Sequence, residues 1–178
     1  MPIIAIAIFA AAAVGAGSAA VAQSSLPGDA LWNFKIYVSE QVRMELSSGQ
    51  KAKAETDLSA IESRLMEARR LSASGRLNAK ALRKVEGNLN TRVAGVERRI
   101  DRLKEDGDYG AAAEVASRFQ SIMASHAEAL SEEQAKAEAL VIAADKAVLG
   151  ELARRARAIL DSASEISADA SAQAAAHL

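Results

Sequence analysis

Few side chains in this 178-residue chain have the type and spacing that chemistry would need. His126 is the one histidine inside the predicted helices, and Glu128 and Glu133 follow it closely, so these three could offer nitrogen and oxygen ligands to a metal ion. A zinc site needs three or four ligands, and no second histidine lies at helical spacing. We therefore expect His126 to be a hydrogen-bonded core histidine or an edge histidine. His177, near the end of the sequence, is assigned no role.

Two charged motifs also need weighing. Asp106-Gly107-Asp108 could suggest a calcium loop, but the twelve-residue spread of ligands ending in glutamate is absent, so a helix-joining turn is expected. Arg154-Arg155-x-Arg157, with Lys146 earlier, could meet anionic lipid or an acidic partner. Glu151 and Asp161 flank this cluster, which favours a solvated helix face.

Catalytic and nucleic-acid-binding patterns are missing from the sequence. No nucleophile elbow, phosphate-binding glycine loop or H-E-x-x-H motif occurs, and nothing pairs two carboxylates in a sheltered cleft. The absence of cysteine excludes disulfides, thiolate metal sites and thiol catalysis. With 22 basic and 23 acidic residues spread along the chain, no basic face for nucleic acid is indicated. We predict a protein without enzyme activity and without a cofactor.

Composition predicts an all-α protein. Hydrophobic residues make up 50% of the chain, many of them alanine, while aromatic residues make up only 3%. Both prolines lie before residue 28, so good helix formers run uninterrupted after that point. We expect an antiparallel helical bundle, or an array of helical hairpins, with four to five helices.

An uncharged segment, residues 3–22, precedes the predicted helices and is long enough to span a bilayer. It ends in Ala20-Val21-Ala22, the small-x-small pattern that suits a signal peptidase cutting after Ala22. No lysine or arginine stands before the segment, which a signal peptide would normally have. A cleaved signal peptide, a retained membrane anchor and a buried core helix are the alternatives. The first two predict an extracytoplasmic protein.

The remainder divides into five predicted helices. The first covers 30–47, with Asp29 as N-cap and Trp32, Phe34 and Tyr37 anchoring it on the core, although it could instead lie on a membrane or a partner. Asn78 is expected to cap the third helix. Ser131 and Gln134 fit a capping box that starts a long fifth helix, which is expected to fray beyond Ser167. The expected organisation is 1–22 as signal or anchor, 23–130 as the bundle, and 131–178 as the long C-terminal helix.

Each predicted helix has an apolar stripe at three- and four-residue spacing. The expected inward positions are Leu31, Phe34, Val38, Val42 and Leu46 in 30–47; Ala54, Leu58, Ile61, Leu65 and Ala68 in 50–73; Leu82, Val85, Leu89, Val93, Val96, Ile100 and Leu103 in 79–106; Ala112, Ala116, Phe119, Met123 and Ala127 in 109–130; and Val141, Ala144, Val148, Leu152, Ala156, Ile159, Ala163 and Ile166 in the last.

The junction before the first helix carries a family resemblance. Its motif residues are Leu26, Pro27, Gly28, Asp29, Leu31, Trp32, Lys35 and Glu40. With Ser25 they resemble the S-L-P-G-D-x-L-Y-x-x-K-x-x-x-E opening of an uncharacterised bacterial family of exported helical domains. The likeness continues through 51–54 and 61–68, closes with Leu71 and Gly75-Arg76, and covers roughly residues 24–130. Trp32 stands where that family has tyrosine. The resemblance implies export and helicity but no mechanism, because the family is a domain of unknown function.

A second likeness concerns Leu46–Gln50 and Leu130–Gln134, which both read L-S-x-x-Q. These segments look similar to the paired L-T-x-x-Q motifs of Spy-type periplasmic chaperones and their metal-sensing relatives. Serine followed by glutamine three residues later is also an ordinary capping box. We therefore expect a structural or regulatory envelope module that acts through a protein partner or self-association. A periplasmic chaperone or a metal or stress sensor is the alternative.

Overall fold

The computed structural model describes residues 24–139 and 143–177, and this part of the chain is helical with no strand. The all-α prediction is therefore confirmed. Ala20, Ala22 and the rest of the N-terminal segment lie outside the described residues. The chain divides into two compact units between Ser48 and Gly49.

In the first unit, Leu26-Pro27-Gly28-Asp29 forms a tight turn. The Asp29 N–H donates to the Leu26 carbonyl at 2.9 Å, and Gly28 has a φ of 110°. Proline at the second position and a positive φ at the third are the features of a type II turn. The Asp29 carboxylate accepts from the Leu26 N–H at 2.8 Å and so closes the turn. The N-cap position of the following helix is occupied by Leu31, so the prediction of Asp29 as N-cap was wrong.

The helix after this turn changes its geometry midway. It comprises α3 (Trp32–Phe34), a π-helical turn η1 (Lys35–Ser39) and α4 (Glu40–Leu46). The Glu40 N–H donates to the Lys35 carbonyl five residues back, which widens the turn. Trp32, Ile36 and Glu40 are buried at four-residue spacing.

The predicted stripe of this first helix was right only in part, because Phe34, Val38 and Val42 are half-buried whereas the two end positions are exposed. Leu31 and Leu46 are 39% and 78% exposed, and Tyr37 is 73% exposed, so these residues do not anchor a core. The prediction assumed an α-helical period throughout, whereas the wider turn changes the face of the residues that follow it, such as Leu46; Leu31 precedes the turn and is not explained by it. Trp32 keeps the buried position expected for it, at 3% exposed.

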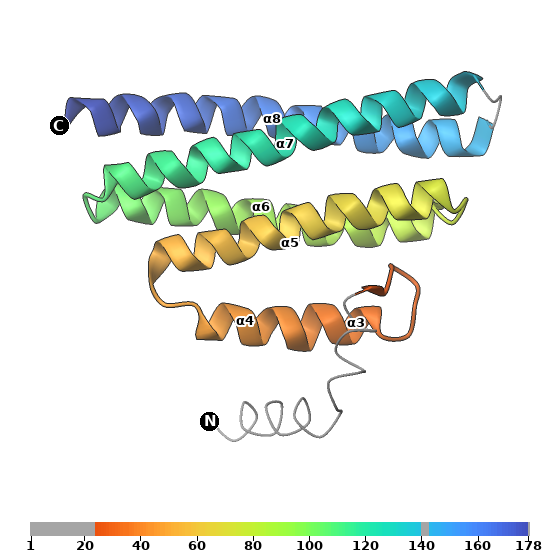
Figure 1. Cartoon of the computed structure of the whole chain (residues 1–178), viewed down its shortest axis with the longest axis horizontal. Helices are drawn as coiled ribbons and strands as arrows, with labels where there is room; N and C mark the ends of the chain where they lie inside the picture. Colours follow the sequence, from red (N-terminus) through yellow and green to blue (C-terminus); the bar gives the residue numbers. More distant parts are fainter. Residues whose placement is uncertain (1–23, 140–142, 178) are drawn as a thin grey trace. The chain divides into compact units, whose positions relative to one another are not determined.

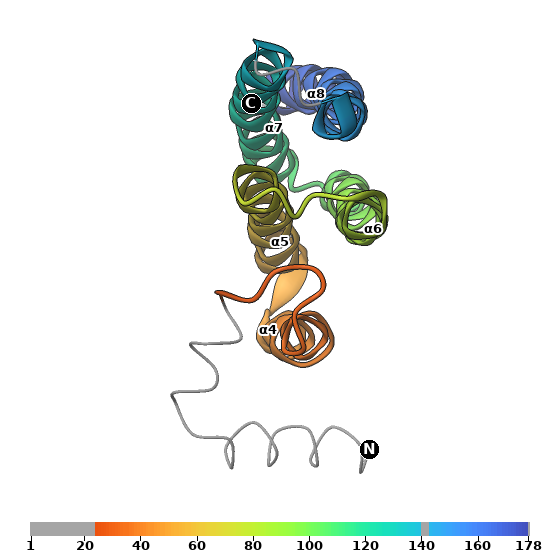
Figure 2. The ribbon, with the colours of Figure 1, turned by 90° about the vertical axis from the view of Figure 1, so that its right-hand side faces the viewer.

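The second unit consists of α5 (Gly49–Ala73), α6 (Ala79–Glu105), α7 (Tyr109–Ala139) and α8 (Ala143–Ala176). In Figure 1 these helices run back and forth as two antiparallel hairpins, α5–α6 and α7–α8. Viewed along the helices in Figure 2, α7 lies next to α5 and contacts both helices of the first hairpin. Helix α8 packs mainly on α7 and only slightly on α6.

The core of this unit follows most of the predicted stripes. Every expected inward residue of α5, α6 and α7 is buried. In α8, Leu152, Ala156 and Ala163 are buried, while Val148, Ile159 and Ile166 are half-buried. Val141 and the side chain of Ala144 lie outside the described part. The regular spacing of the stripes was therefore a reliable guide in this unit.

A turn ends α6 at Gly107, as the sequence predicted. Gly107 has a φ of 78°, and the Asp108 N–H donates to the Leu103 carbonyl at 2.8 Å, which closes the C-terminus of α6. The Asp108 carboxylate then accepts from the Ala111 N–H at 3.1 Å at the start of α7. The expected helix-joining turn at residues 106–108 is confirmed.

Asn78 provides a first testable prediction, because it caps α6 as expected. Its Oδ1 accepts from the N–H groups of Lys80 and Ala81 at 3.1 and 3.0 Å. We expect Asn78→Ala to lower the free energy of unfolding by about 1 kcal/mol. Asn78→Asp keeps an acceptor and should lose little. Urea unfolding of the two variants gives the comparison, and equal losses would contradict the capping role.

Two expected boundaries differ from the structure. Helix α7 continues through Ser131 to Ala139, so the predicted capping box at Ser131 does not start a helix and the expected division at 130/131 falls inside α7. Helix α8 extends to Ala176 rather than fraying after Ser167. At its end the His177 ring stacks on Tyr109, with centroids 4.1 Å apart.

Candidate functional site

Helices α5 and α6 are joined by a buried ion cluster that the sequence analysis missed. Asp57 of α5, whose side chain is 3% exposed, lies between two arginines of α6. Its Oδ1 accepts from Arg92 Nη1 at 3.1 Å, and its Oδ2 lies 2.7 Å from Arg99 Nη1. One carboxylate therefore connects two turns of the neighbouring helix.

Gly95 makes room for this cluster. A Cβ atom at Gly95 would lie 2.3 Å from Asp57 Oδ2 and 3.1 Å from Arg99 Nη1. Only a residue without a side chain lets the carboxylate approach the α6 backbone this closely. Arg99 Nη1 also donates to the Gly95 carbonyl at 2.9 Å. A glycine in a helix interior, with arginines three before and four after it, was the one sequence signal for this site.

The electrostatics of Asp57 combine two opposing effects. Burial raises the pKa of Asp57, while the guanidinium groups of Arg99 and Arg92 act in the opposite direction. Such a carboxylate is costly to bury alone and tolerable with partners at hydrogen-bond distance. The cluster therefore links α5 to α6. Each of its charged groups has an oppositely charged partner, which indicates a structural role.

A second buried ion pair lies on α5 itself. Arg64 Nη2 and Glu67 Oε1 are 3.2 Å apart, and the two side chains are 1% and 3% exposed. With Asp57 they give α5 a second buried face beside its apolar stripe. Pattern analysis assigns charged residues to solvent, which is why this face was not predicted.

The family-motif residues take structural positions in the first unit. Leu26, Pro27, Gly28 and Asp29 form the type II turn, and Trp32 is buried. Lys35 and Glu40 are 6% and 8% exposed, and the widened π-turn joins their backbones. Leu31 is the exception, since it is exposed. Two buried opposite charges on a π-turn were not foreseen from the motif.

His126 of α7 is buried, at 7% exposed, so it is not the edge histidine that was one of the two alternatives. Its Nδ1 has no hydrogen-bond partner among the described residues, so the other alternative, a hydrogen-bonded histidine, is not met at this atom. Burial lowers the pKa of His126, the Arg69 guanidinium lowers it further, and Glu62 opposes both. Glu128 is exposed, and the side chain of Glu133 lies outside the described part.

The arginine cluster of α8 does not form one basic patch. Arg154 pairs with Glu151 on its own helix at 2.5 Å. Arg155 reaches Glu86 of α6 at 3.1 Å, and Arg157 donates to Ser131 of α7 at 2.8 Å. The three guanidinium groups therefore have partners on α8, α6 and α7 respectively; Arg154 and Arg157 are exposed, as the solvated-face interpretation expects, and Arg155 is half-buried.

An acidic groove of about 440 Å³ lies between α6 and α8. Its charged residues are Glu97, Asp101, Lys104, Glu165 and Asp169. Burial, and then repulsion from Asp101, raises the pKa of Glu97, while Lys104 lies 2.5 Å from Asp169 and lowers the pKa of that carboxyl. In the described part of the chain, no three histidine, aspartate or glutamate side chains are placed to hold a metal ion.

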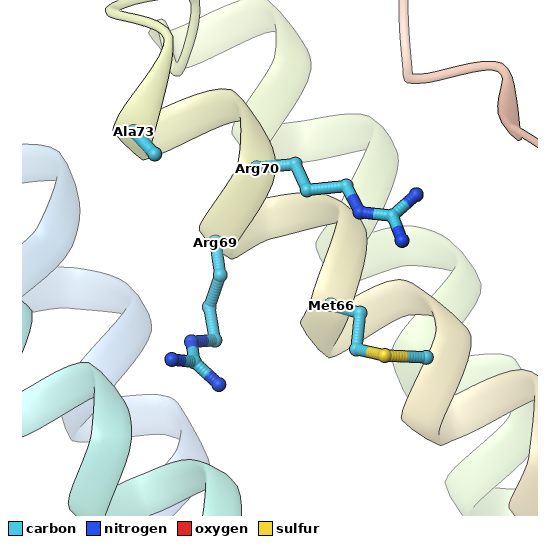
Figure 3. Close-up of a pocket in the computed structure, with 4 residues that line it drawn as sticks. All are labelled: Met66, Arg69, Arg70 and Ala73. Carbon is cyan, nitrogen blue, oxygen red and sulfur yellow. The ribbon is translucent and has the colours of Figure 1, made fainter.

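A shallower pocket of about 310 Å³ lies on α5. Figure 3 shows its lining residues, Met66, Arg69, Arg70 and Ala73. Arg69 extends toward the side on which α7 lies, in keeping with its effect on His126, whereas Arg70 and Met66 extend the other way. A cavity lined by one helix does not enclose a substrate, so it defines no active site.

The two L-S-x-x-Q segments occupy different structural settings. The first spans the break between α4 and α5, with Leu46 exposed. The second lies inside α7, where Ser131 accepts a hydrogen bond from Arg157. The repeated letters therefore do not correspond to a repeated structure.

No helix in the described residues is both long and apolar enough to cross a membrane. Comparison of the chain with protein-family models, with curated proteins and with solved structures finds no match.

Proposed function

We propose that this chain is a non-catalytic, extracytoplasmic helical module that acts through protein–protein contact in the cell envelope. The observation that carries the proposal is the outer face of α8. Because α8 packs mainly on α7, a regular row of its residues faces solvent: Ala147, Arg154, Ala158, Asp161, Glu165, Ala168 and Ala172. From Arg154 onward the row follows three- and four-residue steps and mixes small with charged residues, a spacing that suits pairing with another helix.

Export rests on the uncharged segment 3–22 and on the family resemblance of the junction after it. The charged clusters that could have formed a reactive or binding site have structural partners instead. Asp57 lies between two arginines, Arg154 pairs within α8, and Arg155 and Arg157 contact α6 and α7. If the segment 1–22 is retained, it would also bring this surface to the membrane.

Light scattering after size exclusion, over a range of concentrations of residues 23–178, tests this proposal. We expect a mass above that of the monomer, because the exposed α8 row would pair with a second copy. Ala158→Arg, in the middle of the row, should return the mass to that of a monomer. Ala124→Arg places the same side chain on an exposed position of α7 and should have no effect. A monomer at every concentration would remove self-association from the proposal.

A further inference from the structure

His126 occupies the contact between the two hairpins. It belongs to α7 of the second hairpin, and the charged groups that act on it from the described residues, Glu62 and Arg69, both belong to α5 of the first. No charged group of α6 or α8 in the described part acts on it. The spacing of seven from Phe119 places His126 in the same buried line as that core residue. A change in the charge of His126 should therefore affect the contact between the two hairpins more than the packing within either hairpin.

The surroundings of His126 suit a neutral imidazole. A neutral ring carries one N–H and one lone pair, so an unpaired Nδ1 can remain an acceptor at modest cost. After protonation both ring nitrogens are donors, and Nδ1–H would have no acceptor among the described residues. The added positive charge would also be 93% buried in the same region as the Arg69 guanidinium. Both effects act against the packed arrangement.

We propose that His126 makes the contact between α7 and α5 sensitive to acid, so that protonation of its imidazole separates the α7–α8 hairpin from the α5–α6 hairpin. The hairpins themselves remain formed, because α5 pairs with α6 through the Asp57 cluster and α7 pairs with α8 through its own buried stripe.

The direction of the effect follows from the environment of the ring. Burial and Arg69 lower the pKa of His126 below 6.5, so the packed state favours the neutral form. The stabilising effect is fully present above pH 6.5 and is lost as the pH falls below it. Over this window the ratio of separated to packed molecules should rise up to about tenfold per pH unit.

Spin-label distances measure the separation directly, since the chain has no native cysteine. Exposed serines offer two label pairs: Ser59→Cys with Ser125→Cys spans α5 and α7, and Ser117→Cys with Ser171→Cys stays within the α7–α8 hairpin. On acidification of the whole chain from about pH 7.5 to about pH 5.5, we expect the first distance to lengthen or broaden and the second to stay unchanged. His126→Gln should abolish the change, and His177→Gln, at the exposed histidine, should preserve it.

Three results would overturn the proposal: an α5–α7 distance that does not respond to pH, a response that survives His126→Gln, or equal responses in both label pairs. If His126→Gln fails to fold, the ring resonances of His126 provide a second measurement in the native chain. His126 should then titrate below pH 6.5, together with the change in the α5–α7 distance. Titration of His126 at or above pH 6.5 would contradict the proposal.

Discussion

Leu65→Asp should unfold the unit formed by α5–α8. Leu65 is fully buried on α5, which packs against both α6 and α7. The substitution removes most of a core side chain and buries a carboxylate without a partner, which together cost more than about 4 kcal/mol. A domain of this size has a stability of about 5–15 kcal/mol, so most of it would be lost. Circular dichroism and thermal melting measure the effect.

The neighbouring residue supplies a matched control. Met66 is 41% exposed, so Met66→Asp adds the same charge to the same turn of α5 without entering the core. We expect this variant to stay within about 1 kcal/mol of the native free energy of unfolding. If Leu65→Asp keeps native helicity and melting temperature, the assignment of the α5 stripe to the core is wrong.

Gly95→Ala should destabilise the protein, although alanine is the better helix former. The new Cβ would lie 2.3 Å from Asp57 Oδ2, so the carboxylate must withdraw and its 2.7 Å contact with Arg99 would be lost. A buried carboxylate with a weakened partner is costly, and we expect a loss of about 2–3 kcal/mol in urea unfolding. A gain in stability would show that Asp57 does not lie against Gly95.

Gly87 gives the opposite expectation on the same helix. It is exposed, and a Cβ there would have no atom within 4 Å, so Gly87→Ala should raise the free energy of unfolding by about 0.5–1 kcal/mol. In an Asp57→Ala background the Gly95→Ala clash disappears, so its effect should become neutral or stabilising. A double-mutant cycle therefore tests the contact itself.

The sequence predicted the second unit well where polar and apolar faces are cleanly separated. The stripe of α6, from Leu82 to Leu103, is buried as expected because its other faces are densely charged. For α5 the sequence predicted the buried apolar stripe but not the burial of Asp57, Arg64 and Glu67. Asp57 meets Arg92 across 35 positions of sequence, and local periodicity carries no information on such a pairing.

The errors in the first unit and at the helix ends have local causes. The π-turn at Lys35–Ser39 arises from a shift in the backbone hydrogen bonding, such as that from the Glu40 N–H to the Lys35 carbonyl, which no apolar spacing signals. Ser131 and Gln134 match the capping-box motif, but the alanine-rich residues around them have enough helix propensity for α7 to continue. The end of α8 stays helical because Lys104 binds Asp169 and Tyr109 stacks on His177.

The buried alanines of α7 and α8 limit which substitutions these two helices can accept. Both helices bury small residues: Ala111, Ala112, Ala116 and Ala127 on α7, and Ala153, Ala156, Ala163, Ser167 and Ala170 on α8. A larger side chain at these positions would have to displace its packed neighbours, whereas glycine removes little volume. Substitutions that enlarge the side chain should therefore be poorly tolerated at these positions. Although the alanine-rich stretches have little sequence variety, their buried positions accept the fewest residue types.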